Sequence, residues 1–302
     1  MTRAFLHYDV FTSEPFTGNQ LAVFLDGQGL DERRMQSIAR EMAFSETTFI
    51  FPAETAGTDV RMRIFTPGLE LPMAGHPTIG STFALADTGV IKPGTKVFTF
   101  GLGVGPTPVA LEWSGDRLRF AWMTQLNPEF SPPVADIDAV AAGLGVDRDD
   151  IAGELPIQCV SCGVPFLLVP MISRAAVDRA VSEAGPLRRM GDRIGMNLPV
   201  FLFTTGPGEP EAEVYSRMFS PHFDIGIPED PATGSASGPL GCYLVEYGLT
   251  SGDPAQSILS LQGQKMGRPS RIHIRITGAR ERITKVEIGG ESVLIAKGSL
   301  IA

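Results

Sequence analysis

Short runs of apolar residues with an alternating pattern dominate the chain and predict β-strands. In residues 271–276, three isoleucines alternate with a histidine and an arginine, which is the two-residue period of a half-buried strand. Other short segments are rich in β-branched and aromatic residues and end at Gly, Pro or Asp. We therefore expect strands at residues 5–11, 19–25, 47–52, 59–65, 96–100, 117–123, 164–170, 200–205 and 271–276.

Helical periodicity is rarer than strand periodicity in this sequence. Residues 31–42 place four apolar side chains on one face, and Asp31 is suited to be the N-cap. Residues 136–145 and 173–185 also have a helical pattern. We expect a helix in each of these three segments.

One segment occurs twice. Residues 62–80 read MRIFTPGLELPMAGHPTIG, and residues 216–241 read SRMFSPHFDIGIPEDPATGSASGPLG, with five extra residues in the second copy. Each copy predicts a strand, a glycine turn and a helix, at residues 76–88 and 235–247. Both helices carry small and apolar residues on all sides, which is typical of helices that are buried all round. The duplication predicts two similar halves, each with a sheet around a central helix.

The length and composition agree with an α+β protein of two domains. At 302 residues the chain is long enough for two domains of ordinary size. A Pro-rich stretch at residues 127–134 is the expected boundary, which gives an N-terminal half of residues 1–126 and a C-terminal half of residues 127–302. We expect that the last strand can pack on the N-terminal half.

The charge and the cysteine content exclude several classes of protein. A net charge of −9 argues against a nucleic-acid surface, which needs clustered Lys and Arg. We find no apolar run of the ~20 residues that a membrane helix requires and no signal-peptide pattern. Three cysteines do not suit a disulfide framework. These features predict a cytoplasmic protein without nucleic-acid or membrane partners.

The two glycine turns are the first candidates for function. The first N–H groups of a helix have no partner within the helix, and the helix dipole adds partial positive charge there. A glycine lets a ligand approach the backbone. Gly75-His76 and Gly234-Ser235 therefore predict two sites for a carboxylate or phosphate, which can face each other across a cleft. Alternatively, the glycines only form tight turns before helices with His76 and Ser235 as N-caps.

Three ionisable residues accompany these turns. His76 lies in the first turn, and Asp230 lies just before the second. Glu46 begins a predicted strand and is flanked by Ser45, Thr47 and Thr48, with no Lys or Arg beside it. A carboxylate in such surroundings can act as a general base when it is buried. A solvated surface glutamate is the alternative interpretation.

Taken together, five segments resemble the PhzF-like isomerase family of phenazine biosynthesis. They are residues 9–24, 38–49, 63–80, 216–241 and 261–272, and they include the motifs SETTF, GHP and EDPATGSA. The resemblance spans nearly the whole chain in order. It implies a diaminopimelate epimerase-like fold, in which two similar halves each wrap a curved sheet around a central helix and the active site lies between them.

The resemblance also implies a function. The best-known family member isomerises trans-2,3-dihydro-3-hydroxyanthranilate by moving a proton between ring carbons, without a cofactor or a metal. The family's catalytic residues match Glu46, His76, Asp230 and Ser235. Its substrate-carboxylate site matches the backbone at Gly75-His76 and Gly234-Ser235. The resemblance therefore implies an isomerase of a small cyclic carboxylate, acting as a homodimer.

The chain departs from the family pattern in three places. Asn19-Gln20 stands where many members have Asn-Pro, Met73 replaces a common Phe, and residues 223–228 form a longer connection. We expect these changes at the rim of the cleft, where they bear on the substrate.

Two other functions stay open at this point. One is an amino-acid racemase or epimerase of the same fold, which would use two cysteines at the duplicated turns. This chain has Gly75 and Gly234 there, and its cysteines are Cys159, Cys162 and Cys242. Zinc binding by the CxxC spacing is disfavoured, because no second ligand pair accompanies it. The other function is non-catalytic binding of a small molecule.

Overall fold

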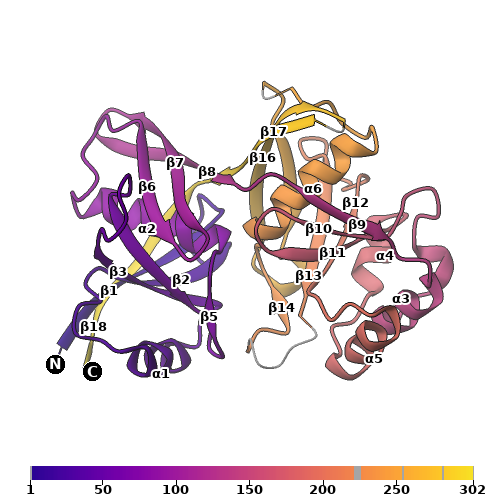
Figure 1. The fold of residues 1–302 in the computed structure, drawn as a ribbon, viewed down its shortest axis with the longest axis horizontal. Coiled ribbons are helices and arrows are strands. Elements are labelled where there is room, and N and C mark those ends of the chain that lie inside the picture. Colours follow the sequence, from indigo (N-terminus) through magenta and orange to yellow (C-terminus); the bar gives the residue numbers. More distant parts are fainter. Residues whose placement is uncertain (1, 221–225, 254, 281, 302) are drawn as a thin grey trace. The chain divides into compact units, whose positions relative to one another are not determined.

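The structure of the protein is a computed structural model that describes residues 2–220, 226–253, 255–280 and 282–301. These residues form two compact units (Figure 1). The first unit takes the described residues of 1–124, 224–226 and 287–302, and the second takes those of 125–223 and 227–286. Within the described residues, every helix is too short or too polar to cross a lipid bilayer.

The first unit is a curved sheet around one helix. Strands β18, β1 and β2 pair antiparallel, β2 pairs parallel with β3, and β3 pairs antiparallel with β4. Strand β4 pairs with β5 and β6, and β6, β7 and β8 form an antiparallel meander. The elements are β1 (Thr2–Val10), β2 (Asn19–Phe24), α1 (Glu32–Met42), β3 (Glu46–Pro52), β4 (Val60–Phe65), β5 (Glu70–Leu71), α2 (Gly75–Asp87), β6 (Val97–Leu102), β7 (Gly105–Ser114), β8 (Arg117–Gln125) and β18 (Ser292–Ile301).

The second unit repeats this plan. Strands β9, β10 and β11 pair antiparallel, β11 pairs parallel with β12, and β12 pairs antiparallel with β13. Strand β13 pairs with β14 and β15, and β15 pairs with β16. The elements are β9 (Glu129–Pro133), α3 (Ile137–Leu144), β10 (Gln158–Ser161), β11 (Pro165–Pro170), α4 (Arg174–Arg179), α5 (Ala184–Ile194), β12 (Val200–Thr204), β13 (Val214–Phe219), β14 (Glu229–Asp230), α6 (Gly234–Glu246), β15 (Ile258–Gln262), β16 (Ser270–Ala279) and β17 (Arg282–Gly290), with short 3-10 turns at Arg148–Asp150 and Gln264–Met266.

The predicted central helices are confirmed in both units. Helix α2 is buried from residue 75 to residue 85 and packs against β1, β2, β3 and β18. Helix α6 is buried over almost the same span and packs against β10, β11 and β16. Each helix has 13 residues and is followed by a left-handed glycine, Gly89 or Gly248, at φ 76° and 71°. Glycine adopts this conformation without strain.

The strand registers show how closely the two units match. Thr47 pairs with Phe65 in the first unit, and Val200 pairs with Phe219 in the second. The parallel strands on the other side of β4 and β13 begin their pairing at corresponding residues as well, at positions 60 and 214. The predicted duplication and the α+β fold are therefore confirmed at the level of individual residue pairs.

A salt bridge is duplicated along with the strands. Arg63 contacts Glu70 through Nε at 2.6 Å, and Arg217 contacts Glu229 through Nε at 2.8 Å. A second nitrogen of each guanidinium binds the other oxygen of the same carboxylate. Each guanidinium also lies over the phenylalanine two residues further along its strand, 5.1 Å and 4.6 Å from the ring centre.

The predicted strands and the helix after Asp31 are present, and Asp31 accepts a hydrogen bond from the Arg34 N–H at 2.7 Å. Two helix predictions need correction. The central helices begin at Gly75 and Gly234, one residue earlier than expected, with Ala74 and Thr233 as N-caps.

The helix expected over residues 173–185 ends at Arg179, and a separate helix begins at Ala184. Pro186 contributes to the break, because its ring would clash with the carbonyl of Ser182 in a continuous helix.

Candidate active site

Glu46 and His76 meet inside the first unit. Glu46 is the first residue of β3, and its side chain lies on the same face as Thr48, two residues on. This face is turned toward α2, because the Thr48 hydroxyl lies 3.0 Å from the Ser81 hydroxyl of that helix. Glu46 Oε2 and His76 Nε2 are 3.1 Å apart. With exposures of only 8% and 3%, both residues are buried, so the surface interpretation of Glu46 is wrong.

The surroundings of His76 keep its imidazole neutral. Burial lowers the pKa of His76 from 6.5 to about 3, although a hydrogen bond with the backbone of Gln20 opposes this shift. Asn19 Nδ2 lies 3.1 Å from His76 Nδ1. With the amide nitrogen of Asn19 as the donor, Nδ1 is the acceptor and the proton of the neutral ring lies on Nε2, on the side of Glu46.

Gln20 is therefore a neighbour of the candidate site. That the Gln20 and Met73 departures lie at the rim of a cleft stays a prediction. Asn19 and Met73 are 0% and 2% exposed, and Asn19 and Gln20 both contact His76. In the third departure, the connection of residues 223–228, residues 223–225 lie outside the described residues.

The turn before α6 holds a different polar set. The Thr233 hydroxyl donates to Asp230 Oδ2 at 2.6 Å. Gln262, on β15, binds this turn through both ends of its amide. Ser235 is half-buried at the second position of the helix. The turn is thus held by side chains that are distant in sequence.

Neither central helix has a side-chain cap at its first turn. Ala74 has no side-chain acceptor to offer, and the Thr233 hydroxyl is directed to Asp230 instead. The helix dipole concentrates partial positive charge at such ends. The first turns at Gly75-His76 and at Gly234-Ser235 are each suited to bind a carboxylate.

Sequence reasoning missed three residues of this site. Of the predicted residues, Glu46, Gly75 and His76 belong to the first unit, and Asp230, Gly234 and Ser235 belong to the second. The roles of Asn19, Thr233 and Gln262 were not foreseen. Their contacts join residues 57 and 29 positions apart, and no local pattern encodes such contacts. That the two turns face each other stays a prediction.

The cysteines do not occupy the turns. Cys242 lies within α6, and its Sγ is 3.8 Å from Cys162 Sγ. Both are fully buried, and hydrogen bonding between them and burial raise the pKa of the Cys162 thiol. A thiol whose pKa is raised is a poor nucleophile and a poor base at neutral pH. Among the described residues, no three His, Cys, Asp or Glu side chains gather as a metal site would require.

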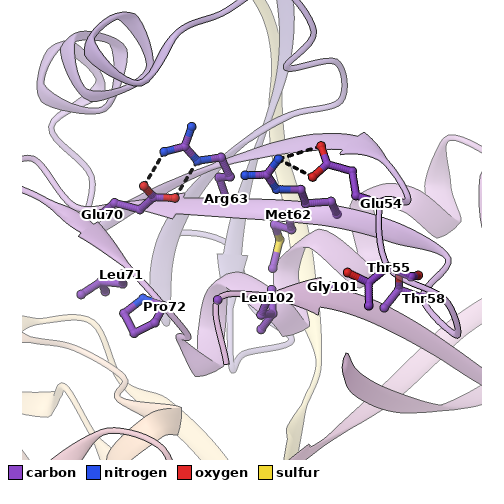
Figure 2. Close-up of a pocket in the computed structure, with 12 residues that line it drawn as sticks. Glu54, Thr55, Thr58, Met62, Arg63, Glu70, Leu71, Pro72, Gly101 and Leu102 are labelled. Carbon is purple, nitrogen blue, oxygen red and sulfur yellow. Dashed lines mark hydrogen bonds and ion pairs between the residues drawn. The ribbon is translucent and has the colours of Figure 1, made fainter. Parts of the chain in front are cut away.

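A cavity of about 530 Å³ in the first unit lies apart from these residues. Along its wall Arg61 pairs with Glu54, and Figure 2 shows Arg63 paired with Glu70. The two arginines are thus matched by carboxylates. None of the predicted site residues lines this cavity.

Comparisons with known proteins show the family of this chain. A family model described as phenazine biosynthesis-like protein matches residues 8–298. The trans-2,3-dihydro-3-hydroxyanthranilate isomerase of Pseudomonas aeruginosa is 37% identical over 298 residues, which cover 96% of each chain. An uncharacterized isomerase of Mesorhizobium japonicum is 36% identical over 309 residues, 99% of each chain. The crystal structure of a PhzF-family phenazine biosynthesis protein from Bacillus anthracis has a TM-score of 0.87 at 27% identity and covers 100% of each chain.

Proposed function

The chain belongs to the phenazine biosynthesis-like protein family and is an isomerase, and we propose that it moves a proton between two carbons of a small cyclic carboxylate by acid–base catalysis without a cofactor. The observation that carries this proposal is the buried pair of Glu46 and neutral His76, 3.1 Å apart. A general base must be close to the proton that it removes and shielded from water, and a buried carboxylate meets the second condition.

In the proposed mechanism Glu46 removes a proton from one carbon and returns it to another. The His76 Nε2–H lies beside the carboxylate and can stabilise its charge after the proton has left for the product. Asn19 holds the imidazole in the tautomer that makes this possible. Because His76 is neutral, it does not protonate Glu46, and the carboxylate stays free to accept the proton of the substrate.

The helix ends supply the binding energy for the carboxylate of the substrate. The first turn of α2 carries His76 itself, so an anion bound to its N–H groups would lie next to the base. The first turn of α6 offers the same chemistry beside Asp230, whose carboxylate suits a substrate amine or hydroxyl. Ser235 adds a hydroxyl at this turn.

A ring carboxylate with an amine is the substrate class that we propose. The named relative from Pseudomonas aeruginosa supports trans-2,3-dihydro-3-hydroxyanthranilate as the first compound to test. The Gln20 backbone contacts His76, and Met73 precedes Gly75 by two residues, so we take these two departures as the positions at which this chain would distinguish its own substrate.

The change of Glu46 to Gln tests the proposal. Glu46→Gln keeps the shape of the side chain but cannot accept a proton, and loss of a general base lowers turnover by roughly 10²- to 10⁴-fold. We expect this loss with trans-2,3-dihydro-3-hydroxyanthranilate or a related ring carboxylate, measured by product formation and by deuterium uptake from D₂O.

The matched control is Glu54→Gln, which changes an exposed glutamate of the same unit that is paired with Arg61. This variant should keep the activity of the parent. A Glu46→Gln protein within threefold of the parent would refute the assignment of the base. Failure of every ring carboxylate to exchange a proton would favour a binding protein.

A further inference from the structure

The second glycine turn is held by polar side chains, and the corresponding positions of the first unit are apolar. Asp230, Thr233 and Gln262 form a polar cluster below the second turn. The strand registers and the helix starts identify their counterparts in the first unit. These counterparts are all apolar: Leu71 for Asp230, Ala74 for Thr233 and Leu102 for Gln262.

The first unit carries a different pair of residues, Glu46 and His76. By the strand registers, Glu46 corresponds to Pro199 of the second unit, because Thr47 and Val200 are corresponding residues. His76 corresponds to Ser235, since each follows the first glycine of its central helix. The two copies have thus kept their backbone plan, and each carries a polar set that the other lacks. A cluster that only stabilised the fold would be expected in both copies.

Gln262 organises the polar set of the second unit. Its Oε1 accepts the Thr233 N–H at 2.9 Å, and its Nε2 donates to the Asp230 carbonyl at 2.7 Å and to Thr233 Oγ1 at 2.9 Å. Turning the amide over would set donor against donor and acceptor against acceptor, so these contacts fix its orientation. The side chain is fully buried.

The orientation of this amide sets the direction of the next hydrogen bond. Because Thr233 Oγ1 accepts from Gln262, its single proton is available for Asp230 Oδ2, 2.6 Å away. Gln262 also holds the backbone on both sides of Pro231 through the Asp230 carbonyl and the Thr233 N–H. One side chain therefore controls both the position of the Asp230 backbone and the contact to its carboxylate.

We propose that Gln262 is a positioning residue, which holds the Asp230 carboxylate through Thr233 for its role at the substrate. The proposal rests on the isomerase function proposed above. Displacement of a catalytic group by about 1 Å can cost on the order of 10²-fold in rate. We therefore expect Gln262→Leu, which installs the first unit's residue, to lower kcat/KM by about 10- to 100-fold.

The control is Gln158→Leu. Gln158 is also a buried glutamine of the second unit, and it binds the Ser131 carbonyl and the Tyr247 hydroxyl rather than the turn. Both variants should lose thermal stability, and only Gln262→Leu should lose turnover. Equal turnover of the two variants would overturn the proposal.

A double-mutant cycle separates positioning from general destabilisation. In an Asp230→Asn protein, the added Gln262→Leu change should lower the melting temperature again but leave the residual turnover unchanged, because the carboxylate to be positioned is gone. A turnover loss of the same factor in both backgrounds would indicate a purely structural residue.

A second variant pair keeps the test decisive if Gln262→Leu fails to fold. Thr233→Ser retains the hydroxyl relay and should keep turnover, whereas Thr233→Val should lose it. Equal turnover of these two proteins would overturn the proposal. If Glu46→Gln loses activity as expected and Gln262→Leu stays fully active, this inference is rejected. The proposed isomerase function would then stand.

Discussion

At the scale of single residues, the proton content of His76 makes the folded protein sensitive to acid. Its pKa is about 3 in the folded protein against 6.5 in an unfolded chain. Between these values the unfolded chain binds a proton that the folded protein excludes, so stability is present above pH 6.5 and is lost as the pH falls toward 3.

This difference predicts a specific effect of His76→Gln. The neutral amide removes the titration, so the free energy of unfolding of the variant should fall less steeply with acid than that of the parent. Between pH 7 and pH 3.5, we expect the parent to lose more free energy of unfolding than the variant, by on the order of a few kcal/mol. Urea unfolding across this pH range provides the measurement. Parallel curves for the two proteins would show that His76 titrates normally.

The sequence located the ionisable residues of the site and missed the residues that support them. Glu46, His76 and Asp230 stand in short motifs, and their residue types alone indicate chemistry. Asn19 and Gln262 are neutral amides within strands, where an amide usually has no special role. Their importance comes from pairing with elements far along the chain, and such pairing is a property of the folded sheet.

At the scale of elements, the two copies of the salt bridge differ in their burial and in the additional hydrogen bonds that the arginine makes. Arg217 is 6% exposed and donates from Nη1 to the carbonyls of Val177 and Ala180 at the end of α4. It thereby satisfies carbonyl groups that a helix end leaves without partners. Arg63 pairs with Glu70 and Glu32 nearer the surface.

This difference predicts that replacing the arginine by methionine lowers the free energy of unfolding by different amounts in the two units. Arg217→Met leaves a half-buried carboxylate and helix-end carbonyls without their donor, and should lower the free energy of unfolding by about 3–5 kcal/mol. Arg63→Met removes a more exposed pair and should cost about 1 kcal/mol. Urea midpoints of the two variants supply the comparison, in which each serves as the control for the other. Equal costs would show that α4 does not depend on Arg217.

Elements with strong local signals were predictable, and helix ends were less so. Nine predicted strands and the helix at Asp31 are present because their periodicity or capping is encoded within a few residues. The break between α4 and α5 depends partly on Pro186. This residue directly follows the helical pattern of residues 173–185, so the prediction did not take it into account. The exact starts of the central helices depend on backbone conformation at Ala74 and Thr233.

At the scale of the whole molecule, the first and last strands of the chain are neighbours. Strand β18 pairs antiparallel with β1 from Thr2 opposite Ile301 to Val10 opposite Ser292. The same β1 pairs with β2 on its other side. Both ends of the chain therefore belong to the sheet that carries Glu46.

Removal of residues 292–302 should destabilise the first unit. The change exposes one edge of β1 and uncovers part of α2, which packs against β18. We expect the melting temperature of this unit to fall by about 10 °C or more, since a unit of this size shifts by ~2–4 °C per kcal/mol. Calorimetry of the full and truncated chains measures it, and a synthetic peptide of residues 292–302 should partly restore the loss. An unchanged transition would show that β18 is dispensable.

The duplication made the whole-molecule plan predictable from sequence, because a repeated strand, turn and helix imply a repeated fold. It could not show how the chain ends are used, since β18 has no particular motif. The division at residues 126 and 127 stays a prediction about separately folding domains. The truncation of residues 292–302 tests the related prediction that the last strand packs on the N-terminal half.

The pairing of β1 with β18 has a consequence for synthesis on the ribosome. Strand β1 emerges well before β18, so the sheet of the first unit waits for β18 until residues 292–301 have been synthesised. The strands of the second unit end by Gly290, before β18 begins, and can pair earlier. The usual order, in which the N-terminal part of a chain finishes folding first, is thereby reversed. A chain that stops before residue 292 would contain Glu46 and still lack β18 beside β1 in its sheet.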